Sequence, residues 1–128
     1  MLKENFFSIE ERTQTEKGWE YSIALNASHP IYQAHFPQNP VTPGVCLVQM
    51  MKEIAEDCCS KSFFICSLKN VKFLQILNPI ENREVLVKFN SLVNEAGRYA
   101  FSAVICKDQL VFSKVNLQLA EISEGGND

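Results

Sequence analysis

One histidine of this chain lies in a segment that is rich in proline. The segment is HFPQNPVTPG, residues 35–44, and it holds His35 together with three of the chain's five prolines. Because proline fixes its own φ angle and favours extended backbone at the residue before it, the segment is stiff and the imidazole is held in place. Histidine changes charge near neutral pH, so a fixed imidazole is suited to removing a proton. His35 is therefore the first candidate for a catalytic base.

The residues that end this segment predict the start of a helix. Thr42 is a suitable N-cap, Pro43 suits the first helical turn, and Gly44 lets a ligand approach the backbone closely. The amides of Gly44 and Val45 would then point out of the helix start, where free N–H groups favour an oxygen that gains negative charge. A single loop histidine is more often structural, and we expect this of His29, but the combination at residues 35–45 favours catalysis.

The helix that must carry this site follows at once. Over residues 45–58 the apolar side chains recur at intervals of three and four, which predicts one buried stripe made of Leu47, Val48, Met51, Ile54, Ala55 and Cys58. The opposite, polar side holds Gln49, Lys52, Glu53 and Glu56. We expect no second helix, because no other segment shows this periodicity.

Strand patterns occupy most of the remaining chain. Residues 6–14 and 18–26 have strand character, and the turn at residues 16–18 predicts a hairpin. Four further segments from residue 63 onward are expected to form an antiparallel meander: FFICSLKNVKFLQIL, REVLVKFNSLV, YAFSAVICK and LVFSKVNLQLAEI. A single helix wrapped by such a sheet is an α+β architecture. We expect one domain over residues 1–128, with residues from about 122 to 128 as a frayed tail.

The composition excludes several classes of function. Hydrophobic residues make up 46% of the chain and charged residues 21%, with a net charge of −3, so there is no basic excess for binding nucleic acid. No apolar run reaches the length of a membrane span, and no signal peptide is evident, so we expect a cytoplasmic protein. The five cysteines lack the spacing of a zinc site and are expected to serve as small apolar side chains, so we expect no metal and no cofactor.

The segment HFPQNPVTPGVCLVQMM resembles the HFPxxPxxPGxxxxE segment of the hotdog-fold 3-hydroxyacyl-[acyl-carrier-protein] dehydratases. A second segment, LKNVKFLQILNP, is similar to a strand of that family with a V-K-F core and a proline-ending turn. The resemblance implies a hotdog fold, in which a long central helix is wrapped by a curved antiparallel sheet of about five to six strands. It also implies a homodimer whose sheets join edge to edge, with higher oligomers open, and an acyl thioester of acyl carrier protein or coenzyme A as the partner.

The resemblance further implies roles for individual residues. His35 would remove a proton from the carbon next to the thioester carbonyl, and the carbonyl of Val41 would hold the imidazole. The amide of Gly44 would polarise the thioester oxygen, with Phe36 and Val45 beside it in the substrate site. Apolar side chains could line a slot for the acyl chain, although each is more often plain core: Phe36, Met50, Phe64 and Phe73.

The chain departs from the family where the second catalytic residue is expected. The family has Glu or Asp fourteen positions after the histidine and contributes it to the site of the partner subunit. This chain has Gln49 there, whose amide cannot give up a proton at neutral pH. Glu53 lies one helical turn further on and is the alternative acid. A dehydratase-like enzyme of fatty-acid, polyene or related lipid synthesis is the leading hypothesis. A hotdog thioesterase and a non-catalytic partner subunit without the acid are the alternatives.

Docking of an acidic carrier protein would need basic side chains near the site. The candidates are scattered along the sequence: Lys69, Lys72, Arg83, Lys88 and Arg98.

Overall fold

The computed structural model describes residues 2–34 and 38–122. Its elements follow in the order β1 (Phe7–Gln14), β2 (Gly18–Leu25), α1 (Pro30–Ala34), α2 (Gly44–Cys59), β3 (Phe63–Phe73), β4 (Glu84–Glu95), β5 (Arg98–Lys107) and β6 (Leu110–Glu121). The expected long helix and all the expected strands are therefore present, and the architecture is α+β. Within the described ranges no helix has the length and apolar content that crossing a membrane requires.

The six strands form one antiparallel sheet in the order β1-β2-β4-β5-β6-β3. The expected hairpins β1–β2, β4–β5 and β5–β6 are confirmed. The expected four-strand meander is wrong in one respect, because β3 pairs with β6 and not with β4. Residues 74–83 form a connection too long for a tight hairpin, and they carry the chain from β3 to β4, which lies between β2 and β5. β3 is consequently an edge strand.

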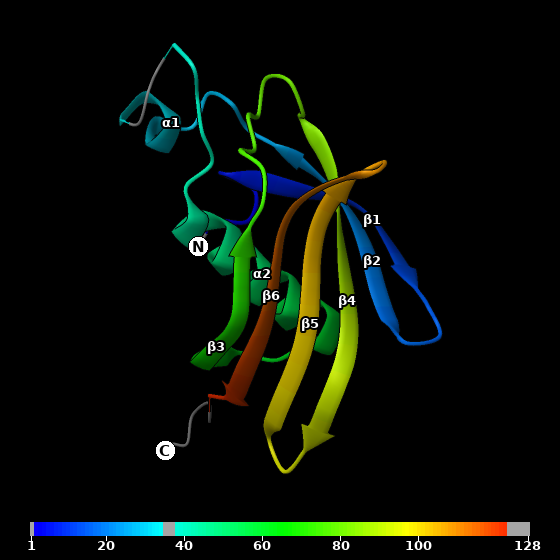
Figure 1. Ribbon diagram of the computed structural model, residues 1–128. Helices are drawn as coiled ribbons and strands as arrows, with labels where there is room; N and C mark the ends of the chain where they lie inside the picture. Colours follow the sequence, from blue (N-terminus) through cyan, green and yellow to red (C-terminus); the bar gives the residue numbers. More distant parts are fainter. Residues whose placement is uncertain (1, 35–37, 123–128) are drawn as a thin grey trace.

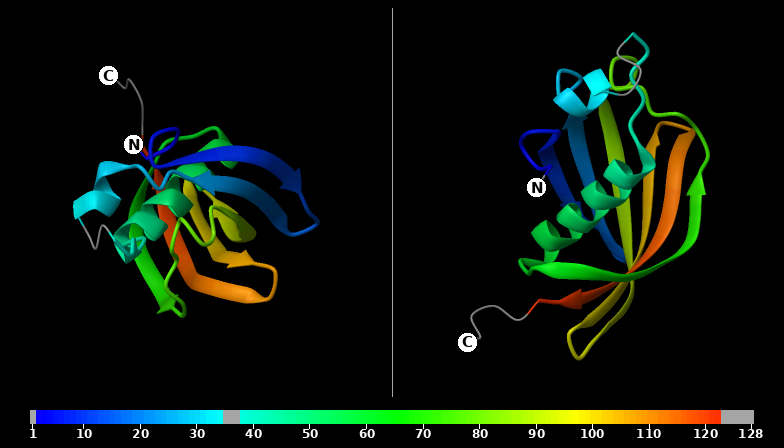
Figure 2. Two further views of the ribbon diagram at one scale, coloured as in Figure 1. Left: turned by 90° about the horizontal axis from the view of Figure 1, so that it is seen from above. Right: turned by 90° about the vertical axis from the view of Figure 1, so that its left-hand side faces the viewer.

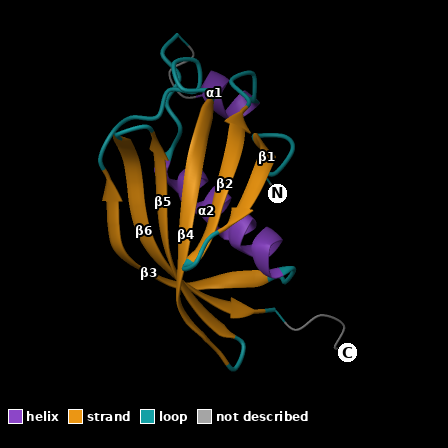
Figure 3. Cartoon of the chain, turned by 90° about the vertical axis from the view of Figure 1, so that its right-hand side faces the viewer, coloured by secondary structure: helices purple, strands orange, loops and turns teal. Residues whose placement is uncertain are grey.

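Helix α2 lies across the concave face of the curved sheet, as Figures 1 and 2 show from three directions. Its predicted apolar stripe faces the sheet, and Met51, Ile54 and Ala55 have no exposed surface. Inward side chains of the strands complete this core, among them Tyr21, Ile23, Val87 and Leu117. Figure 3 views the convex face of the sheet, with the helix behind it.

Two local expectations need correction, the absence of a second helix and the burial of Cys66. The structure contains a second, short helix, α1, which begins at Pro30 and is supported by His29, whose Nδ1 accepts a hydrogen bond from the Ile31 amide. At the C-terminus, the amide of Ile122 donates to the Ser62 carbonyl at 2.8 Å, so backbone pairing reaches residue 122, and the rest of the expected tail lies outside the described residues. Among the cysteines, Cys46 and Cys106 are buried as expected, whereas Cys66 is exposed.

Candidate functional site

The first turn of α2 is built differently from the expected capped helix start. Pro43 occupies the N-cap position in extended conformation, and no side chain caps the helix. The hydroxyl of Thr42 is instead hydrogen-bonded to the Tyr32 hydroxyl at 2.9 Å, and the Thr42 amide donates to the Leu77 carbonyl. The predicted N-cap at Thr42 is therefore wrong, because α1 supplies a competing buried partner. Burial raises the pKa of Tyr32 to about 12.

The amides at the helix start remain available. The Pro43 carbonyl accepts from the amides of Cys46 and Leu47, while the amides of Gly44 and Val45 form no hydrogen bond to any residue within 2–34 and 38–122. Two free N–H groups at the start of a 16-residue helix favour an oxygen with partial negative charge. The Val45 side chain is 78% exposed and Gly44 is half-buried, so the start of the helix lies at the surface of a single chain.

A pocket of about 340 Å³ opens beside this helix start. It is lined by Val41, Gly44, Leu47 and residues 73–77 of the chain that follows β3. The ring of Phe73 packs directly on Gly44, because a Cβ atom at position 44 would lie 2.9 Å from the Phe73 Cζ atom. Glycine therefore permits the close approach of an aromatic ring as well as access to its amide.

The proposed base itself is not placed. His35 and Phe36 lie outside the described residues, so their positions in the site stay predictions. The segment that follows them is anchored, since Pro40 and Thr42 are buried and Val41 lines the pocket. Among the proposed slot residues, Met50 is fully buried, whereas Phe64 and Phe73 are 52% and 53% exposed and are not plain core in a single chain.

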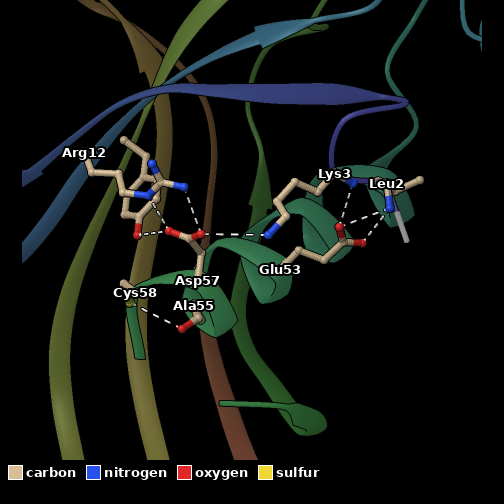
Figure 4. A network of polar contacts seen from close by, with 8 residues as sticks. Leu2, Lys3, Arg12, Glu53, Ala55, Asp57 and Cys58 are labelled. Carbon is tan, nitrogen blue, oxygen red and sulfur yellow. Dashed lines mark hydrogen bonds and ion pairs between the residues drawn. The ribbon is translucent and has the colours of Figure 1, made fainter. Parts of the chain in front are cut away.

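Gln49 and Glu53 are in contact one turn apart on α2. The Gln49 Nε2 donates to the Glu53 carboxylate at 2.7 Å. The same carboxylate accepts hydrogen bonds from the backbone amides of Leu2 and Lys3, as Figure 4 shows. Glu53 is only 1% exposed, so the polar side that the sequence predicts is buried at this position. The N-terminal segment covers Glu53, and no local periodicity could have revealed that.

Asp57, one turn beyond Glu53, forms a second polar cluster. Its carboxylate accepts from the Arg12 guanidinium at 2.6 and 3.0 Å and from the Tyr21 hydroxyl at 2.7 Å. Lys3 lies 3.8 Å from the same group. The hydrogen bond from Arg12 is the main cause that lowers the pKa of Asp57. Burial, followed by the bond to Asp57, raises the pKa of Tyr21. Each charged or polar group named here has a hydrogen-bond or ion-pair partner, so this cluster stabilises the fold.

The long helix α2 wrapped by one curved antiparallel sheet defines a hotdog-fold protein. The family model for ApeI dehydratase matches residues 10–115. The chain belongs to the ApeI-like dehydratase family, within the broader hotdog-fold dehydratases.

Individual relatives agree with this assignment. A 3-hydroxyacyl-[acyl-carrier-protein] dehydratase FabZ from Caldicellulosiruptor saccharolyticus is 28% identical over 125 residues, covering 88% of this chain and 86% of the relative. The solved dehydratase heterocomplex ApeI:P from Xenorhabdus doucetiae matches with a TM-score of 0.68 at 22% identity, over 88% of this chain and 96% of that chain. A Haemophilus influenzae thioesterase structure matches with a TM-score of 0.60 at 14% identity, over 91% and 78%. These two structures confirm the hotdog fold.

Proposed function

We propose that this protein dehydrates 3-hydroxyacyl thioesters to 2-enoyl thioesters. The observation that carries the proposal is the uncapped start of α2, where the amide of Gly44 borders a pocket directly after the histidine-containing segment. Membership of a dehydratase family supports the same reaction. His35 acts as the base at C2, and the Gly44 amide stabilises the negative charge that develops on the thioester oxygen. The Val41 carbonyl orients the imidazole.

Because Gln49 replaces the acidic residue of the family, another group must protonate the departing hydroxyl. One N–H of the Gln49 Nε2 donates to Glu53, which leaves the amide oxygen and the second N–H for a ligand. We infer that Gln49 binds the departing hydroxyl, while the imidazolium of His35 returns the proton it took from C2. The C2–H and C3–O bonds break, the C2–C3 double bond forms, and water leaves. Glu53 holds Gln49 in position and does not itself donate a proton, because its oxygens already accept from three backbone and side-chain groups.

The active unit is a dimer formed through β3. One side of β3 pairs with β6, and its other edge has no strand partner in the described chain. Exposed apolar side chains gather on and just after this strand: Phe64, Leu68, Val71, Phe73, Leu74 and Ile76. An open strand edge with an apolar surface is typical of an interface. The second subunit is another copy of this chain, and a related chain, as in the ApeI:P heterocomplex, is the alternative.

The carrier is an acyl carrier protein. The strand register places Lys72 opposite Lys114, and Lys114 opposite Val104, which in turn faces Lys88. Like charges directly opposite each other destabilise a sheet, so this row favours an acidic partner. Reversing both charges with Lys72→Glu and Lys114→Glu should raise the KM for carrier-protein thioesters severalfold and leave that for coenzyme A thioesters unchanged. An equal rise for both carriers would contradict this docking site.

The decisive test is a product assay with wild-type protein and His35→Ala. Wild type should convert a 3-hydroxyacyl thioester to the conjugated enoyl thioester, and His35→Ala should lose about 10²- to 10⁴-fold in kcat. Unchanged activity in the variant would overturn the proposal.

The amide at position 49 also suits a thioesterase, because an amide can orient a water molecule for attack on the thioester carbonyl. A thiol reagent distinguishes the two reactions: hydrolysis releases free thiol, whereas dehydration does not.

A further inference from the structure

Ser113 on β6 has a buried hydroxyl group without a partner. The residue is 0% exposed, and its Oγ forms no hydrogen bond to any part of the described chain. The other buried polar side chains, Thr42, Glu53 and Asn78, all have partners. An unpaired buried hydroxyl lowers stability, so folded proteins rarely retain one without a reason.

The strand register locates this hydroxyl near the candidate site. Ser113 lies opposite Phe73 on β3 and opposite Ile105 on β5. Directly opposed residues of an antiparallel pair project their side chains to the same face. The Phe73 ring packs on Gly44, so this face is the concave one that α2 covers. Ser113 therefore lies one strand in from the sheet edge, behind the ring that covers the helix start.

Phe73 links the pocket to Ser113, because it lines the pocket and is the register partner of Ser113. Its ring lines the 340 Å³ pocket, and the residue is 53% exposed on an edge strand. Movement of this one ring would extend the pocket from Gly44 toward the Ser113 hydroxyl.

We propose that Ser113 is a specificity-determining residue that hydrogen-bonds an oxygen carried by the acyl chain of the substrate. The inference rests on the proposed function, since Gly44 then binds the thioester oxygen and fixes the carboxyl end of the chain. Ser113 lies beyond Phe73 from Gly44, so the oxygen belongs to a carbon further along the chain than the reacting C2 and C3. The preferred substrate class is an acyl thioester with an additional oxygen substituent, and a plain alkyl chain leaves the hydroxyl unpaired.

The test compares a set of medium-chain 3-hydroxyacyl-CoA thioesters that differ only in the position of a second hydroxyl, together with the unsubstituted parent. Wild type should prefer one positional isomer over the parent by about five- to tenfold in kcat/KM, the worth of one hydrogen bond. In Ser113→Ala this ratio should fall to about one. Because the substitution removes an unpaired buried group, the unfolding temperature should stay the same or rise.

Ser67→Ala is the matched control. Ser67 lies on the neighbouring strand β3, and its hydroxyl already bonds Gln118 at 2.5 Å, so the variant should keep the wild-type preference. Ser113→Cys retains the side-chain shape with a weaker hydrogen-bonding group. The same isomer preference can be measured with this variant if Ser113→Ala does not fold.

Calorimetric binding of the same thioesters separates the two proposals. Absence of turnover with a retained, Ser113-dependent binding preference would overturn the dehydratase proposal and support this inference. Dehydration without preference among the isomers, or a preference that survives in Ser113→Ala, would overturn this inference and leave the dehydratase proposal standing. A lower unfolding temperature in Ser113→Ala would also count against it, because the hydroxyl would then have a structural partner.

Discussion

The two halves of α2 treat their polar groups in opposite ways. In the C-terminal half, Glu53 and Asp57 are enclosed by donors from the N-terminal segment, β1 and β2, and the helix ends in a left-handed residue, Ser60, whose amide bonds the Glu56 carbonyl. At the N-terminal end, the amides of Gly44 and Val45 have no hydrogen-bond partner among the residues that the structure describes, and the N-cap residue Pro43 offers no side-chain cap. A group with a partner stabilises the fold, whereas an available donor can bind a ligand. We therefore assign a structural role to the C-terminal half of α2 and a role in the reaction to its N-terminal end.

Gly44→Ala should produce the largest effect at the open end. The added Cβ would meet the Phe73 ring at 2.9 Å, so the ring moves aside and the methyl group displaces the thioester from the amide. Displacements of about 1 Å cost roughly a hundredfold in rate, and we expect such a loss in kcat/KM. Lys52→Ala is the control, since this side chain of the same helix pairs with Glu56 and lies outside the candidate site. Equal losses in both variants would show that the close contact at Gly44 is irrelevant.

Gln49→Glu changes the polar contact that joins the two halves of the helix. The new carboxyl would lie about where the Gln49 amide now bonds Glu53, and two carboxyl groups that close together share a proton. That proton is available to the leaving hydroxyl, so dehydration should rise by about tenfold or more. Gln49→Leu should not show this gain. Slower dehydration by Gln49→Glu would mean that the reaction requires an amide at position 49.

Asp57→Asn should affect stability and leave the chemistry alone. Removing the charge weakens the bonds to Arg12 and Tyr21 and should cost about 1–2 kcal/mol in the free energy of unfolding, measured by urea denaturation. The kcat of the folded variant should stay at the wild-type value. Glu84→Gln, in an exposed pair with Arg83, should cost about 0.5 kcal/mol or less.

The pH dependence follows from the direction of the Asp57 shift. Folding lowers its pKa from the ordinary value of 3.8, so its stabilising contribution is full above that value and is lost as the pH falls through the folded pKa. Wild type should therefore lose stability more steeply in acid than Asp57→Asn. Parallel acid profiles would contradict a structural role for this cluster.

Helix α2 and the hairpins depend on residues close together in the sequence, and the sequence pattern predicted them. The three-and-four spacing of apolar residues predicted α2 to within one residue at each end, and the turn residues predicted the hairpins. The pairing of β3 with β6 and the burial of Glu53 depend on contacts about 50 residues apart, which a local pattern does not contain.

The candidate site shows the same division. The glycine at the helix start was evident from residue types, whereas the Phe73 ring over it and the capture of Thr42 by Tyr32 are tertiary contacts. Ser113 left a signal that could have been used, because it is the polar member of an inward-facing alternation with Val115, Leu117 and Leu119.

The central claim is that proton abstraction occurs at the open end of α2, and isotope exchange tests it most directly. In D₂O, wild type and Asp57→Asn should incorporate deuterium at C2 of a 3-hydroxyacyl thioester, and His35→Ala should not. Exchange at C2 requires a base and a stabilised oxyanion, even where departure of the hydroxyl is slow. Absence of deuterium in the wild-type reaction, or equal incorporation with His35→Ala, would contradict the account.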